Sequence, residues 1–128
     1  MSKSEAHLLN ELILHYDQKG LGRLFRNNRG ACYDQTGRLI RYGLANESKA
    51  VDKVLKSSDL IGITKMIITP EDVGRVVAVF TSFEVKRENW QYKGTDREEA
   101  QRAWIRLIRG QGGTASFISD IAQLKGAK

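Results

Sequence analysis

Two amphipathic helical segments bracket a run of strand-like segments, and this order constrains the fold more than any other feature. Residues 5–16 place apolar side chains along one helical face, and a second helix opens at Thr95 or Asp96 with the capping pattern Thr95-x-x-Glu98. Strand patterns lie between and after them. Helices that cover a mixed sheet give this order, so the sequence predicts an α/β fold. Its 128 residues suit a single domain, residues 1–128.

The strand predictions have definite bounds. Ala31–Tyr33 and Arg38–Tyr42 flank Asp34-Gln35-Thr36-Gly37, which is a hairpin turn sequence. Further strands are expected over residues 60–68, 76–86 and 114–118, with a turn at 69–72. A short helix over 46–56 would be capped by Asn46 or Ser48, and a terminal one by Ser119 or Asp120. The second long helix is expected to bury a stripe made of Ala100, Ala103, Trp104, Leu107 and Ile108.

The composition limits the chemistry that is open to this chain. A single cysteine, Cys32, excludes an internal disulfide and any CxxC site, and the two histidines make a histidine metal centre improbable. A metal here would be a hard cation held by carboxylates. No apolar stretch reaches the length that a bilayer requires, and no secretory signal is visible, so a cytoplasmic protein without membrane contact is expected. The net charge of +6 indicates a polyanionic partner or, as the plain alternative, a solubility surface.

Carboxylates occur at positions where they could meet. Residues two apart on a strand share a face, so Glu84 and Lys86 should point the same way, either into a cleft or as a surface ion pair. Asp59 precedes the apolar run that starts at Leu60, where it is a candidate ligand or an ordinary turn residue. Glu5 falls on the apolar face of the first helix, whereas Glu11 points to solvent. The alternative for Glu5 is helix capping through Ser2-x-x-Glu5. Crowded carboxylates would be relieved by Mg²⁺ or Mn²⁺.

An acid before one strand, followed by Glu84-Val85-Lys86 at the end of the next, is the pattern of the PD-(D/E)xK nucleases. Six ordered blocks resemble the virus-type replication-repair nuclease (VRR-NUC) domain of that superfamily over residues 5–119. These blocks are Ser4-Glu5, Arg26-Asn27-Asn28-Arg29-Gly30, Ser58-Asp59-Leu60-Ile61-Gly62-Ile63, Phe83-Glu84-Val85-Lys86, Gln101-x-x-Trp104 and Gly112-Gly113-Thr114-Ala115. Two features depart from the pattern: Ser58 replaces the usual proline, and the segment 44–56 is longer than usual.

The resemblance implies a restriction-endonuclease-like sandwich with an αβββαβ core and a central mixed sheet flanked by helices. It implies a Mg²⁺- or Mn²⁺-dependent endonuclease that hydrolyses phosphodiester bonds in branched DNA. Stand-alone members of the family resemble phage and bacterial homodimers that act on four-way (Holliday) junctions, without a nucleotide cofactor. A phage-encoded protein of this kind would work in the cytoplasm of its host.

The resemblance also assigns residues. Glu5, Asp59, Glu84 and the Val85 carbonyl become metal ligands, and Lys86 becomes the catalytic lysine, with Gln101 beside them as a catalytic residue. The alternative for Gln101 is an exposed helix position. The predicted DNA contacts are Arg26, Asn27, Asn28, Arg29, Arg87, Trp90 and Lys93.

Alternatives to these DNA contacts stay open. The segment from Arg26 to Arg29 is otherwise a solvated loop, and Trp90 could stack on an unpaired base or pack at a dimer interface. Arg102, Arg106 and Arg109 form a basic helical stripe that would track a phosphate backbone or simply be solvated. Two other functions also stay open: a flap, nick or general nuclease of the same fold, and a non-catalytic basic DNA-binding protein.

Overall fold

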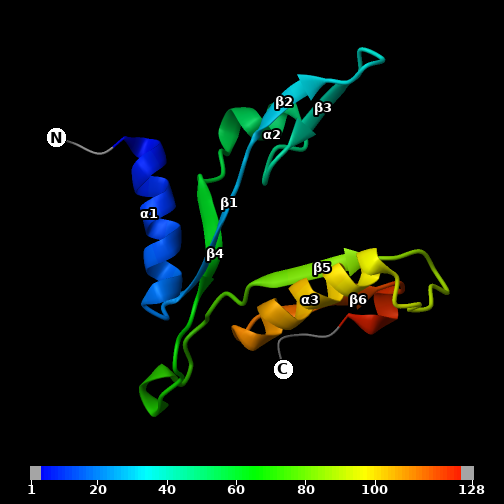
Figure 1. The fold of residues 1–128 in the computed structure, drawn as a ribbon. Helices are drawn as coiled ribbons and strands as arrows, with labels where there is room; N and C mark the ends of the chain where they lie inside the picture. The colour runs from blue at the N-terminus through cyan, green and yellow to red at the C-terminus, as the bar shows by residue number, and fades with distance from the viewer. Residues whose placement is uncertain (1–3, 125–128) are drawn as a thin grey trace. The chain divides into compact units, whose positions relative to one another are not determined.

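A computed structural model describes residues 4–124 of the chain, and it confirms the predicted mixed α/β class. Within that part the strands pair two by two, β1 with β4, β2 with β3 and β5 with β6 (Figure 1). The bounds of these strands are Gly22–Arg26, Gly30–Tyr33, Leu39–Tyr42, Leu60–Thr64, Thr81–Val85 and Thr114–Ile118. The chain divides into two compact units, Met1–Gly62 and Ile63–Lys128, and each is described by itself.

The first helix, α1, covers Glu5–Gln18 and packs against β1 (Figure 1). Its N-cap is Ser4, whose hydroxyl accepts a hydrogen bond from the His7 amide, and the Ser2 of the expected capping pattern lies outside the described residues. Gly20, at φ 66°, follows the C-terminal end of the helix. The half-buried positions follow the predicted helical spacing and are Leu9, Ile13 and Tyr16.

The predicted hairpin is confirmed by β2 and β3, which pair antiparallel with Tyr33 opposite Leu39. Asp34 closes the turn because its Oδ1 accepts from the hydroxyl of Thr36 at 2.6 Å and from the amide of Arg38 at 2.9 Å. These hydrogen bonds, led by the Thr36 hydroxyl, hold the pKa of Asp34 below its usual value. The turn therefore depends on a short polar side chain that satisfies its own backbone.

The segment that follows the hairpin is folded rather than open. Its helix α2 covers Lys49–Val54, and of the two predicted caps Ser48 is the one used, by accepting from the amide of Val51. Asn46 is instead buried and donates to the carbonyls of Gly30 and Tyr42 at 2.7 and 2.9 Å. One amide side chain thus ties this segment to both strands of the hairpin.

Two of the predicted strands are shorter than expected. The strand expected over 60–68 ends at Thr64, and the strand expected over 76–86 is reduced to Thr81–Val85. Between them lies a 3-10 turn, Pro70–Asp72, at the predicted turn position. Ile67 and Val76 are 87% and 98% exposed. These apolar residues have no neighbouring strand to pack against within the described residues, and an apolar pattern alone does not form a strand.

The second unit is built on a strand–helix–strand motif. β5 and β6 run parallel with Glu84 opposite Phe117, and α3, Asp96–Gly110, connects them and packs on both (Figure 1). The predicted capping box of Thr95 and Glu98 is present. After β6, Asp120 caps a 3-10 turn, Ile121–Gln123, which selects one of the two predicted terminal caps.

The buried stripe of α3 differs from the predicted one. Ile108 is buried and Leu107 is half-buried, as predicted, but Ala100, Ala103 and Trp104 are exposed. The covered positions that the prediction missed are Glu98, Gln101 and Ile105. The prediction followed the apolar residues, but the first half of this helix buries polar side chains against β5 and the loop before it. These polar contacts, which are described below, account for the difference between the predicted and the observed buried face of α3.

We expect Ile108→Ala to lower the free energy of unfolding by about 2–5 kcal/mol, because Ile108 is fully buried beside Ile105 and Ala115. Denaturant titration measures this change. Val76→Ala, at an exposed position of the same unit, should stay within about 0.5 kcal/mol. Equal effects of the two substitutions would contradict this assignment of the core.

Candidate functional site

A chain of hydrogen bonds joins the end of β5 to the first half of α3. The Nζ of Lys86 donates to Oε1 of Gln101 at 2.8 Å, and Nε2 of Gln101 donates to Oε1 of Glu84 at 2.8 Å. Lys86 Nζ lies 3.9 Å from the same Glu84 oxygen. The predicted shared orientation of Glu84 and Lys86 is thereby confirmed. The alternative of an exposed Gln101 is wrong, because this side chain is half-buried and bonded at both ends.

Both the side chain and the main chain of Lys86 make contacts that fix its position. Its side chain is only 15% exposed, and its ammonium lies 5.4 Å from the ring centre of Trp90 and 5.7 Å from that of Phe117. Its own backbone amide donates to the carbonyl of Ile118, which extends the β5–β6 ladder by one residue. Lys86 is thus fixed by main chain, by Gln101 and by two aromatic rings.

Glu98 anchors the loop that covers Lys86. Its carboxylate accepts from the indole N–H of Trp90 at 3.0 Å and from the amides of Lys93 and Thr95 at 3.0 and 3.1 Å. Burial by itself raises the pKa of Glu98, but these hydrogen bonds outweigh it and hold the pKa below the usual value. The capping box was predicted, whereas the reach of Glu98 to Trp90 follows from the path of the loop and has no sequence signal.

An open hollow lies beside the cluster, and its wall adds a residue that the sequence reasoning missed. Glu84 and Gln101 line this hollow together with Arg97 and Trp104. Arg97 stands one helical turn before Gln101, so the i, i+4 spacing on a helix would have found it. Trp104 donates its indole N–H to the hydroxyl of Ser82 at 2.8 Å. A cation thus stands at the rim of the hollow that holds the carboxylate.

The two other predicted acidic ligands belong to the first unit. Asp59 is exposed and immediately precedes β4, and its carbonyl accepts from the amide of Asn27, just after β1. Glu5 is the first residue of α1, and Arg26 at the end of β1 donates to Asn10 of that helix at 2.7 Å. The end of β1 is therefore hydrogen-bonded both to the middle of α1 and to the residue before β4.

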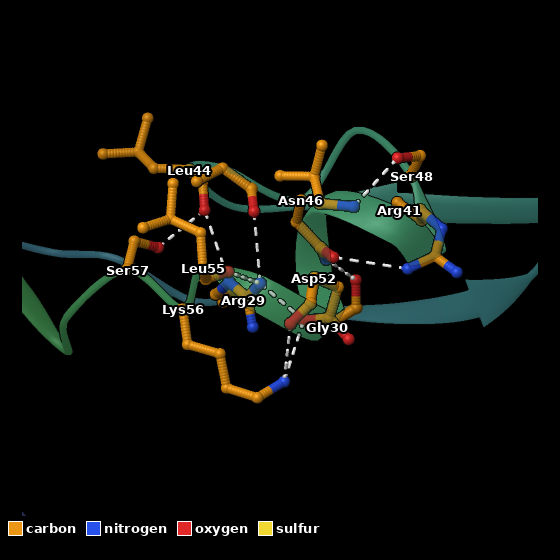
Figure 2. Close-up of polar contacts among 12 residues, drawn as sticks. Arg29, Gly30, Arg41, Leu44, Asn46, Ser48, Asp52, Leu55, Lys56 and Ser57 are labelled. Carbon is orange, nitrogen blue, oxygen red and sulfur yellow. Dashed lines mark hydrogen bonds and ion pairs between the residues drawn. The ribbon is translucent and has the colours of Figure 1, made fainter.

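Arg29, in the predicted DNA-contact segment 26–29, makes several contacts within its own unit (Figure 2). Arg29 pairs with Asp52 at 2.5 Å and donates to the carbonyls of Leu44, Ala45 and Leu55 at 3.1–3.3 Å. Hydrogen bonds from Lys56 and then from Arg29 hold the pKa of Asp52 below its usual value. Arg29 therefore stabilises the position of the longer segment 44–56.

Asn27 also forms hydrogen bonds at the start of the segment 44–56 and just after its end. It donates to the hydroxyl of Ser57 at 2.7 Å and the carbonyl of Ser58 at 2.9 Å, and accepts from the amide of Leu44 at 3.1 Å. The side chains of the predicted DNA-contact residues Asn28, Arg87 and Lys93 are exposed. Trp90 is half-buried, and its ring lies 4.8 Å from that of Phe117.

The cluster offers two oxygen donors of the kind that hard divalent cations bind. Glu84 offers a carboxylate, one oxygen of which is oriented by Gln101, and Val85 follows it in β5 with its backbone carbonyl. Within residues 4–124, no three Asp, Glu, His or Cys side chains lie together as a ready-made metal site. Glu84 is accordingly the one predicted carboxylate ligand that belongs to the second unit.

Comparisons with known proteins give no relative. No protein-family model matches the chain, and neither curated proteins nor solved structures contain a match to it. In the part of the chain that the structure describes, none of the helices has the length and apolar character needed to cross a bilayer.

The pKa of Glu98 leads to a prediction about acid stability. A carboxyl group whose pKa is lower in the folded than in the unfolded protein stabilises the fold above its unfolded pKa. That contribution is lost as pH falls through the folded value. Glu98→Gln should therefore reduce the melting temperature at about pH 7 and reduce it less at a pH low enough to protonate the wild-type carboxyl as well.

Thermal melts over this pH range test the prediction, with Glu88→Gln, an exposed position in the same loop, as the control. A destabilisation by Glu98→Gln that is equally large at both pH values would contradict it.

Proposed function

We propose that the chain is a metal-dependent endonuclease of the VRR-NUC type that cleaves branched DNA, with the four-way junction as its substrate. The observation that carries the proposal is the hydrogen-bonded series Glu84–Gln101–Lys86 at the end of β5. It joins an acid, an amide and a cation, and its acid and amide line one hollow together with Arg97. Phosphodiester hydrolysis uses groups of these kinds. The finer fold under this proposal is the restriction-endonuclease-like sandwich in a single domain.

Each residue of the series has a role in this proposal. Glu84 binds the metal through its carboxylate, with the Val85 carbonyl as a further ligand. Gln101 orients that carboxylate and hydrogen-bonds the scissile phosphate or the attacking water. Lys86, held against two rings, orients the water or neutralises charge that develops at phosphorus. Arg97 at the rim contacts a neighbouring phosphate.

Mg²⁺ or Mn²⁺ would supply a water of lowered pKa and stabilise negative charge on the phosphate. The sequence resemblance also names Asp59 and Glu5 as metal ligands. Both belong to the first unit, Glu5 at the start of α1 and Asp59 directly before β4. The carboxylate set is of the type that hard cations prefer.

The basic surface supplies DNA contacts in this proposal. Arg26, Asn28, Arg87 and Lys93 expose their side chains and are the preferred phosphate contacts. Arg29 and Asn27 act mainly by holding the segment around α2, as their internal hydrogen bonds indicate. We propose a homodimer, because two copies would place two active sites on the two strands of a junction.

Cleavage assays with labelled DNA test the function. With Mg²⁺ or Mn²⁺ the wild-type protein should make paired nicks in a four-way junction. Glu84→Ala and Lys86→Ala should each reduce the rate by about a hundredfold or more, because metal binding and transition-state charge depend on them. Gln101→Leu should cost about tenfold or more as the loss of an orienting group. Binding of uncleaved junction should change by no more than a few fold.

Matched variants sharpen this assay. Glu88→Ala, exposed just after β5, should cleave like the wild type. Glu5→Ala should greatly reduce the cleavage rate. Glu11 is an exposed residue of the same helix, 3.8 Å from His7, and Glu11→Ala should leave the cleavage rate nearly unchanged. Equal cleavage of flap, duplex and junction would retain the nuclease and remove the junction specificity. Tight binding without cleavage of any substrate would contradict the enzyme and leave a DNA-binding protein.

A further inference from the structure

A second pocket in the same unit lies on the other flank of α3 and is built from aromatic rings and arginines. Trp90 and Tyr92 enter it from the loop and Phe117 from β6, while α3 contributes Arg102 and Arg109. Neither Glu84 nor Gln101 lines it. Its lining therefore differs from that of the hollow assigned to hydrolysis.

The rings of this pocket form one connected cluster. Phe117 lies 4.8 Å from Trp90 and 6.0 Å from Tyr92, measured between ring centres, and Trp90 and Tyr92 meet edge to face at 6.2 Å. Tyr92 keeps 37% of its surface exposed and is fixed by a hydrogen bond from its hydroxyl to Glu99. A fixed and partly exposed ring is the surface on which a planar molecule stacks.

The two arginines give the pocket its charge. The guanidinium carbon of Arg102 lies 5.4 Å from the centre of the Tyr92 ring, and Nε of Arg109 donates to the carbonyl of Ala115 at 2.8 Å. They stand two helical turns apart, about 10 Å along the axis, with buried Ile105 between them. Among the described residues, a ring contact thus positions Arg102 and a hydrogen bond from Nε positions Arg109, and a guanidinium has five N–H groups with which to bind an anion.

We propose that this pocket binds an unpaired nucleotide of a DNA strand. Its base would stack against the Tyr92 ring, and the phosphates on either side of it would contact Arg102 and Arg109. Aromatic stacking recognises any base, and guanidinium groups recognise phosphate, so the pocket fits single-stranded character rather than sequence. The choice of DNA as the strand rests on the proposed function, whereas the stacking and charge do not.

A binding measurement tests the pocket separately from cleavage. Fluorescence anisotropy of a labelled oligothymidine of about 12 nucleotides in EDTA excludes any metal-dependent reaction. Tyr92→Leu should weaken binding by at least about fivefold, and Tyr92→Phe, which retains the ring, by less than about twofold. Arg102→Gln should weaken it by about tenfold, whereas Arg106→Gln, the same charge change outside the pocket on the same helix, should stay within about twofold.

Each other outcome overturns the proposal. Equal losses from Arg102→Gln and Arg106→Gln would mean diffuse electrostatic binding. Equally tight binding of the matched duplex, with the same dependence on Tyr92, would remove the preference for an unpaired nucleotide. Saturation by free thymidine monophosphate at the affinity of the strand would make the occupant a small molecule. Circular dichroism of Tyr92→Phe and Tyr92→Leu shows whether both are folded.

The nuclease and the pocket can fail independently. Loss of strand binding in the Tyr92→Leu variant with no cleavage by the wild type would support the pocket and reject the enzyme. Cleavage with no effect of Tyr92 or Arg102 on strand binding would do the reverse.

Discussion

The hydrogen bonds that Gln101 makes to Glu84 and Lys86 determine how α3 lies on the β5–β6 pair. Because one amide side chain satisfies an acid and a base at once, the polar first half of α3 can face the strand without leaving buried groups unpaired. The second half of the same face carries Ile105 and Ile108 and supplies the apolar core. One face of α3 thus carries the residue that orients the site in its first half and the residues that pack the core in its second half.

The loop between β5 and α3 depends on the same face. Glu98 binds the start of the helix and the indole of Trp90, and Trp90 in turn covers Lys86. Loss of the Glu98 carboxylate would therefore affect Lys86 indirectly, through Trp90. The hollow with Glu84 and Arg97 and the pocket with Tyr92 and Arg102 lie on different flanks of α3.

Local patterns were predictable from the sequence wherever one side chain satisfies nearby backbone. The hairpin closed by Asp34 and the capping box of Thr95 and Glu98 belong to this class. The shared face of Glu84 and Lys86 was predictable from the alternation of side chains along a strand. Apolar runs were less informative, because β5 begins only at Thr81 and the run around Val76 lacks a partner strand. The stripe of α3 was misplaced because buried polar residues such as Gln101 are indistinguishable by type from exposed ones.

For the candidate site, the sequence indicated which residue types could meet, and the fold supplied the contacts that select among them. Gln101 lies at the centre of the cluster, bonded to both Glu84 and Lys86, and Tyr92 entered only through the packing of the loop against α3. Arg29 differs in the opposite sense, because it was predicted to contact DNA as part of a basic, amide-rich segment, whereas its guanidinium binds Asp52 and three carbonyls. Charge in a sequence does not reveal whether an internal partner already exists.

The most direct test of the central claim is whether Glu84 binds a divalent metal. Titration of the full chain with Mn²⁺, followed by the electron paramagnetic resonance signal of the free ion, measures this without DNA. Binding of Mn²⁺ by the wild type and by Glu88→Ala, with loss of that binding in Glu84→Ala, is the predicted result. Unchanged Mn²⁺ binding by Glu84→Ala would contradict the account, because the hydrogen-bonded series at the end of β5 would then be a structural contact and not part of a catalytic site.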